Sequence, residues 1–154
     1  MDLVLLKPGN VDIQDDYLSL IDGTVNGEDM TGCIELVSCS YGMSQQMTTD
    51  VSNQARTSGR PNLNDITVVK YLDVASPVLY RHCLSATPID DGDEGEPTKI
   101  FLCRNANQEG DGNLIEPIIV ISLWNCMISS IQAQSHPNDM ATEQFTLNYT
   151  DIEW

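Results

Sequence analysis

The chain has 154 residues, with 7 Lys or Arg against 23 Asp or Glu, so its formal net charge is −16. Such a negative chain is a poor ligand for nucleic acid or an anionic membrane, because both attract cationic residues. There is no apolar run of membrane-spanning length and no signal-peptide pattern, so we expect a protein made in the cytoplasm as a single domain covering residues 1–154.

The cysteines are odd in number and lack paired spacing, since no CxxC occurs. This pattern favours buried, reduced thiols over a disulfide framework or a zinc site. The five positions are Cys33, Cys39, Cys83, Cys103 and Cys126.

In the N-terminal part, residues Leu3–Lys7 form a predicted strand that Pro8-Gly9 ends. A second strand is predicted over Ile34–Tyr41. Both of its faces mix apolar and polar residues, which indicates surroundings that change along its length. Residues from about 42 to 62 are polar and aperiodic, which predicts a long extended loop that has a function or is ordered by a partner.

A strand rich in β-branched residues, Asn64–Leu72, leads into the one predicted helix, at about residues 77–86. Ser76 is the N-cap candidate and Pro77 suits the first turn. The expected apolar stripe of the helix consists of Val78, Leu79, Cys83 and Leu84.

The C-terminal half is predicted to consist of strands separated by polar turns. Asp90–Pro97 is an acidic turn, Lys99–Arg104 a strand, and Ile118–Gln134 a long strand bent or broken near Ser129-Ser130. From Gln144 to Trp154 the residues alternate, with Phe145, Leu147 and Tyr149 pointing inward. These elements predict a mainly β, mostly antiparallel protein with one short α-helix, built either as a barrel or as two packed sheets.

Few residues suggest chemistry. His82 and Cys83 are adjacent on the predicted helix and point about 100° apart, so they do not form a catalytic pair. Asn105–Glu116 resembles an EF-hand loop at several positions, but it begins with Asn and strands flank it. We therefore predict no enzyme activity, no cofactor and no metal. The alternative class is a monomeric calcium-binding β domain or hydrolase that uses Asn105–Glu116.

The stretch SGRPNLNDITVVKYLDVASPVLYRHC resembles the central signature of the Hcp family, the inner-tube protein of bacterial type VI secretion. Two further blocks, IELVSCSYGMSQ at Ile34–Gln45 and LWNCMISSI followed by EQFTLNY, are similar to other strands of that family. Cys39-Ser40-Tyr41 replaces the usual W-S-W, Asn10–Ser19 looks inserted, and Asp90–Pro97 is unusually acidic. The matching signature positions are Asp65, Ile66, Thr67, Lys70, Tyr71, Asp73, Ser76, Pro77 and Leu79.

The resemblance implies a two-sheet antiparallel β-barrel with one short α-helix, which acts as a structural subunit and closes into six-membered rings. The rings stack into a hollow tube that a contractile sheath expels and whose lumen carries effector proteins. Implied partners are further copies of the chain, effectors, a spike protein at the tube tip, and sheath and baseplate proteins. The related alternative is the tube of a phage-tail-like or extracellular contractile injection particle.

Small polar side chains on one strand face make Ser38 and Ser40 candidates for the lumen, and Gln45 and Gln46 follow at the mouth of the long loop. Candidates for ring assembly or stacking lie in and near the signature, where much of the scarce positive charge is found. They are Arg56, Arg60, Asn62, Asp65, Lys70 and Asp73.

Overall fold

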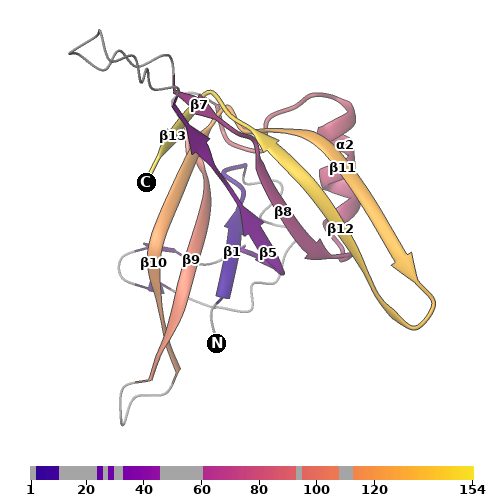
Figure 1. The fold of residues 1–154 in the computed structure, drawn as a ribbon, viewed down its shortest axis with the longest axis horizontal. Coiled ribbons are helices and arrows are strands. Elements are labelled where there is room, and N and C mark those ends of the chain that lie inside the picture. Colours follow the sequence, from indigo (N-terminus) through magenta and orange to yellow (C-terminus); the bar gives the residue numbers. More distant parts are fainter. Residues whose placement is uncertain are drawn as a thin grey trace, which may run out of the picture.

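Two antiparallel sheets face one another across a shared apolar core (Figure 1). The structure, a computed structural model, describes residues 3–10, 24–25, 28–29, 33–45, 61–92, 95–107 and 113–154. The prediction of a mainly β protein is confirmed, and the described residues hold a single helix. No helix in these ranges is long and apolar enough to cross a membrane.

The larger sheet has five strands in the order β13-β10-β9-β1-β4. The predicted strand at Leu3–Lys7 is confirmed as β1, and it lies between β4 and β9 with antiparallel pairing on both sides. The strands of this sheet are β1 (Leu3–Lys7), β4 (Ile34–Leu36), β9 (Thr98–Asn107), β10 (Asn113–Trp124) and β13 (Asp151–Glu153).

The smaller sheet has four strands in the order β11-β12-β8-β5. Its strands are β5 (Ser38–Ser40), β8 (Ile66–Tyr71), β11 (Met127–His136) and β12 (Asp139–Asn148). Two short ribbons complete the strands, one of β2 (Thr24–Val25) with β3 (Glu28–Asp29), the other of β6 (Met43–Ser44) with β7 (Asn62–Leu63). The second ribbon joins the two ends of the predicted long loop, and residues 46–60 lie outside the described residues.

The segment predicted as one strand, Ile34–Tyr41, passes from one sheet to the other at Val37. Ile34 and Leu36 are buried in the five-stranded sheet, whereas Ser38 and Ser40 are exposed in the four-stranded sheet. The inward phase of the alternation therefore reverses at Val37. This confirms the prediction that the surroundings of this segment change along its length.

The long strand predicted over Ile118–Gln134 is two strands, with a corner between the sheets at Asn125-Cys126. Asn125 adopts a positive φ of 52° there. Near Ser129-Ser130 the strand does not break, and the predicted alternative of a bend agrees with the shift in register between β11 and β12 from Ile128 to Ser130. A bulge bends a strand without ending it, so the polar Ser pair marks the bend and the left-handed Asn125 marks the corner.

Of the two arrangements predicted from the elements, the structure has the two packed sheets, and the barrel that the family resemblance implies is not closed. Three corners connect the sheets, at β4–β5, β10–β11 and β12–β13, but no hydrogen-bonded ladder joins an edge of one sheet to an edge of the other in the part of the chain described. Figure 1 shows the β9–β10 and β11–β12 hairpins spreading apart below these corners. The two sheets therefore form an open, splayed sandwich.

The core between the sheets is built from alternate positions of the strands, and Phe145 and Leu147 point inward as predicted. Its fully buried members include Leu6, Ile34, Ile66, Val68, Leu79, Ile100, Ile121 and Leu123. Burying each such side chain contributes about 1.5–3 kcal/mol. All five cysteines are free; Cys33, Cys103 and Cys126 are buried, and Cys39 and Cys83 are partly buried.

Helix α2 (Ser76–Leu84) packs against β11 of the four-stranded sheet, and Figure 1 shows it beside that strand. It begins and ends slightly earlier than the predicted 77–86, and Pro77 lies in its first turn as expected. Leu79 is fully buried, but Leu84 is 88% exposed, so its place in the predicted apolar stripe is wrong. Leu84 is the last residue of the helix, and it lines a surface pocket with Ile131 and Ala133 of β11 rather than entering the core.

Asp90 holds the β10–β11 corner. Its carboxylate accepts hydrogen bonds from the backbone N–H groups of Asn125 and Cys126, each at 2.9 Å, and its side chain is buried. Asp90→Ala should lower the free energy of unfolding by about 1–3 kcal/mol, because it leaves buried N–H donors unpaired. Urea denaturation measures this. The exposed neighbour Asp91→Ala is the control, and an equal loss in both variants would contradict the role of Asp90.

Candidate functional site

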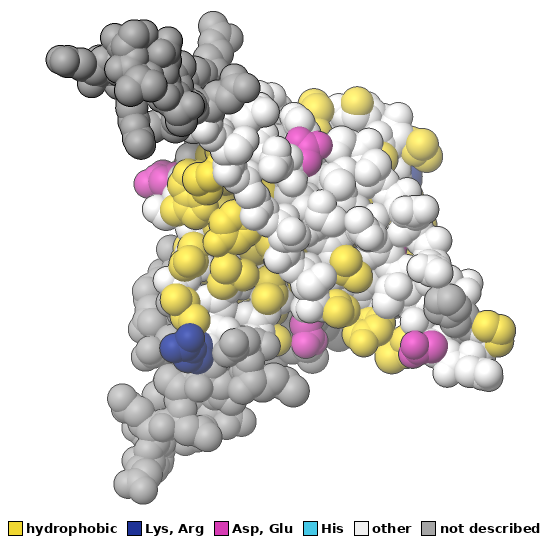
Figure 2. Space-filling model, in the orientation of Figure 1, with side chains coloured by type: hydrophobic (Ala, Val, Ile, Leu, Met, Phe, Trp, Pro, Cys, Tyr) yellow, Lys and Arg dark blue, Asp and Glu magenta, His cyan; other side chains and the backbone are white. Residues whose placement is uncertain are grey.

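Among the residues described, the strands of the four-stranded sheet carry no charged side chain on their outward face, and the carboxylate of Asp65, just before β8, lies at one end of it. Figure 2 shows this side, where uncharged atoms fill the middle and acidic groups lie toward the edges. Its members alternate along each strand with the buried residues, so they point to the other face of the sheet. They are Ser38, Ser40, Thr67, Val69, Tyr71, Ser130, Gln132, Gln134, Thr142, Gln144, Thr146 and Asn148. On a chain of charge −16, this neutral face is a distinct surface.

The lumen candidates fall partly on this neutral face. Ser38 and Ser40 are exposed on β5, where they lie opposite Val69 and Thr67 of β8. Gln45 is exposed just after β6. Gln46 lies outside the described residues. The two serines thus lie on one surface, and Gln45 lies near one end of the sheet.

The assembly candidates are spread over different surroundings. Arg56 and Arg60 lie outside the described residues. Asn62 is exposed on β7. Asp65 is exposed and accepts hydrogen bonds from the Asn148 amide at 3.0 Å and the Ser129 hydroxyl at 3.2 Å. Asp65 therefore connects β8, β12 and β11 at one end of the sheet.

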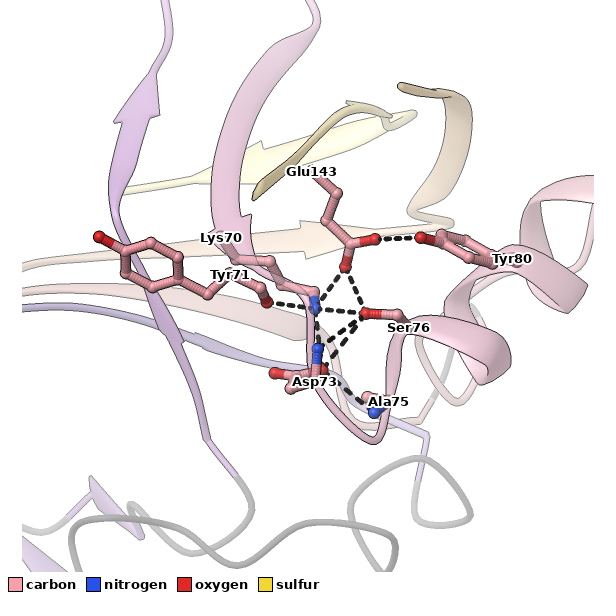
Figure 3. Close-up of polar contacts among 7 residues, drawn as sticks. All are labelled: Lys70, Tyr71, Asp73, Ala75, Ser76, Tyr80 and Glu143. Carbon is pink, nitrogen blue, oxygen red and sulfur yellow. Dashed lines mark hydrogen bonds and ion pairs between the residues drawn. The ribbon is translucent and has the colours of Figure 1, made fainter. Parts of the chain in front are cut away.

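Lys70 is fully buried, so its ammonium group does not reach the subunit surface. It lies on the inner face of β8 directly opposite Glu143 of β12, and the two side chains form an ion pair (Figure 3). The Nζ atom also donates to Asp73 Oδ1 at 2.9 Å and to the Tyr71 carbonyl at 3.2 Å. The structure thus places Lys70 in an internal network rather than at a contact surface.

Ser76 joins this network to the helix. Its hydroxyl donates to Glu143 Oε1 at 2.8 Å and accepts from Lys70 Nζ and from the Asp73 N–H, each at 3.1 Å. The predicted N-cap role of Ser76 is wrong, because Ala75 is the N-cap residue and makes no side-chain cap. Asp73 Oδ1 instead accepts from the Ala75 N–H at 3.1 Å, which fixes the turn before the helix.

Tyr80, one turn further along α2, donates its hydroxyl proton to Glu143 Oε2 at 2.6 Å. Burial, followed by this bond to a carboxylate, raises the pKa of Tyr80 from 10.0 to about 12. Both oxygens of the buried Glu143 are therefore satisfied, one by Lys70 and Ser76 and the other by Tyr80. A buried charge is tolerated when it is paired and hydrogen-bonded in this way.

Glu143 is not among the candidate residues named from the sequence. Glu143 is 1% exposed. Its signal was the alternation itself, since Phe145 and Leu147 point inward and the same phase extends back to Glu143.

The other candidates for chemistry are not assembled into a site. His82 and Cys83 are both partly buried, and His82 Nδ1 has no hydrogen-bond partner. Within the described ranges, no group of His, Cys, Asp and Glu is placed to hold a metal ion. The centre of the EF-hand-like loop, residues 108–112, lies outside the described residues, as do the side chains of its flanks.

Fold and surfaces thus define an open β sandwich with one neutral face, and comparison with known proteins supplies the family. The family model described as "Type VI secretion system effector, Hcp" matches residues 11–154. The chain therefore belongs to the Hcp family, and it is a subunit of the type VI secretion tube. No curated protein matches the sequence.

Solved structures share the fold at low sequence identity. A type six secretion system protein aligns with a TM-score of 0.67 and 16% identity, over 99% of this chain and 82% of that chain. Hcp3 from Pseudomonas aeruginosa aligns with a TM-score of 0.57 and 14% identity, over 99% and 88%. The cap that terminates the tube of the anti-feeding prophage aligns with a TM-score of 0.52 and 13% identity, over 97% and 85%.

Removing one charge of the buried ion pair should lower the free energy of unfolding more than removing both charges does. Lys70→Met should lower the free energy of unfolding by about 3–5 kcal/mol, because Glu143 is left buried without a counter-charge. Adding Glu143→Gln should restore part of the loss. Urea titration of the single and double variants measures the coupling, with the exposed Arg81→Met as control. Strictly additive losses would contradict the pair.

Tyr80 should make stability fall at high pH. Its folded-state pKa of about 12 exceeds its ordinary value of 10.0, so its contribution is complete below pH 10 and is lost as pH rises toward 12. Tyr80→Phe should therefore lose less stability across this window than the wild type. Chemical denaturation at several alkaline pH values measures this, and parallel pH curves would be inconsistent with the bond to Glu143.

Proposed function

We propose that this chain, as a single domain, closes into six-membered rings through the two edges of its four-stranded sheet. Strands β5 and β11 are the outer strands of that sheet, and neither has a further strand partner in the part of the chain described. An unpaired edge readily pairs with another chain. Because the two edges differ, contact between copies is head-to-tail, and such a contact makes a ring when the rotation closes.

The single observation that carries the orientation of the subunit is the uncharged outward face of the four-stranded sheet (Figure 2). In a ring, one face of each subunit looks across the channel at its copies. Any charge on that face would be repeated around a narrow space, and like charges would repel. The neutral face with Ser38, Ser40 and Gln144 therefore suits the lumen, while the acidic groups lie elsewhere.

The lumen is the surface that effector proteins contact, with Ser38, Ser40, Gln45 and Gln46 as the contact residues. Assembly uses the region of Arg56, Arg60, Asn62, Asp65 and Asp73. The subunit has a structural role without catalysis. It is made in the cytoplasm and exported by the type VI system, with the spike, sheath and baseplate proteins as further partners.

Rings should be visible directly. Negative-stain electron microscopy and native mass spectrometry of the purified protein at physiological salt should show six-subunit rings. If the purified protein is a monodisperse monomer at every salt concentration tested, the proposal is wrong. The salt series matters because screening reduces the repulsion between copies of charge −16.

Gold labelling distinguishes the lumen from the outer wall. A maleimide gold cluster on Gln144→Cys should appear at the centre of rings seen end-on. The matched label on Ile118→Cys, an exposed position of the other sheet, should appear at the rim. The wild type, labelled in parallel, gives the background from Cys39 and Cys83. Central gold on Ile118→Cys would reverse the assignment of the faces.

A further inference from the structure

We infer that the rings stack through two exposed apolar clusters at opposite ends of the four-stranded sheet, and that the occupant of each cluster is the other cluster on a second copy of this chain. This inference rests on the proposed ring and names the surfaces and the chemistry of the contact between rings. We call the clusters the Val74 end and the Leu63 end.

The Val74 end lies where β8 finishes and β12 begins. Tyr71, Leu72 and Val74 are 45%, 38% and 80% exposed, and Met140 is 63% exposed. The Leu72 N–H donates to the Ala141 carbonyl at 3.0 Å, and Tyr71 lies opposite Thr142, so the four residues belong to one region. Figure 2 shows hydrophobic side chains along this lower part of the face.

The Leu63 end lies at the start of β8. Leu63 and Met43 are direct partners in the β6–β7 ribbon, and they are 45% and 55% exposed. Tyr41, just before β6, is 37% exposed. The six residues of β8 separate the two ends, a distance of roughly 20 Å at ~3.3 Å per residue. Figure 1 shows β7 and the arrowhead of β8 at opposite ends of the sheet.

Charge explains why stacking uses these clusters. Copies of charge −16 repel, so a stable contact needs a local attraction, and burial of exposed apolar side chains supplies one. Acidic residues border both ends, with Asp65 beside the Leu63 end, and Asp73 and Asp139 beside the Val74 end. Whichever two ends meet, acidic groups are therefore brought close together. Among the described residues, the attraction at such a contact comes from burial of the exposed apolar side chains.

The two ends are different surfaces on opposite sides of the subunit. A contact of one with the other repeats without closing, and it generates an open filament of rings. A contact of each end with itself would generate only alternating ring orientations. The geometry therefore points to one polarity along the tube.

Two double variants test this. Val74→Ser with Met140→Ser removes the exposed apolar groups of one end, and Met43→Ser with Leu63→Ser removes those of the other. All four side chains are more than two-fifths exposed, so the subunit should fold normally. Val74→Ile with Met140→Leu keeps the apolar area and is the matched control. Electron microscopy counts rings, ring pairs and longer stacks.

Each double variant should form single rings and lose stacks, while the matched control stacks like the wild type. Mixing preassembled rings of the two variants should give ring pairs and nothing longer, because one intact end of each kind remains. Wild-type stacks should lengthen as salt rises from about 0.01 M to about 0.15 M, since screening weakens the acidic repulsion.

Several results would contradict the proposed stacking surfaces without contradicting the proposed six-membered ring. Unchanged stacking in a double variant would exclude that end, and ring pairs formed by one variant alone would mean that an end contacts itself. Stacks that dissolve as salt rises would mean that ion pairs hold the rings. If the variants lose rings altogether while remaining folded, the clusters act within the ring. Failure of the wild type to form rings is the separate result that rejects the proposed function.

Discussion

The buried ion pair of Lys70 and Glu143 is the constraint on which this subunit depends. It lies on the inner face of the four-stranded sheet, beneath the start of helix α2, where no charge can stay unpaired. Ser76 and Tyr80 reach it from the helix, and Asp73 reaches it from the turn between. One network thereby joins β8, β12 and α2. The network and the neutral face thus lie on opposite faces of the same sheet.

The second constraint is the net charge of −16. A chain that repels its own copies can assemble only where charge is absent or the surface is apolar. The fold provides both kinds of surface on one sheet, with a neutral polar face in the middle and exposed apolar clusters at the two ends. The unpaired edges β5 and β11 complete the set of surfaces that a ring-forming subunit needs.

Local patterns predicted most elements because their causes are local. Alternation of Phe145 and Leu147 gave the inward face of β12, and Pro77 placed the start of the helix. Errors arose where distant residues decide. The corner at Asn125-Cys126 depends on Asp90, some 35 positions earlier in the chain. Ser76 looked like a helix cap because its role depends on Glu143, 67 positions later. Leu84 looked like a core residue because helical periodicity does not show how far the neighbouring strand covers the apolar stripe.

By itself, the sequence determined the class of fold, the low tendency to bind polyanions and, through the signature from Ser58 to Cys83, the family resemblance, which the family model confirms. These follow from residue order, propensity and composition. Only the tertiary structure decided that the sheets stay open, that Lys70 is internal rather than a surface contact, and that the neutral and apolar groups gather on one sheet. The reason is physical, because burial and register pair residues that lie far apart along the chain, and one sequence read in order does not show which faces meet.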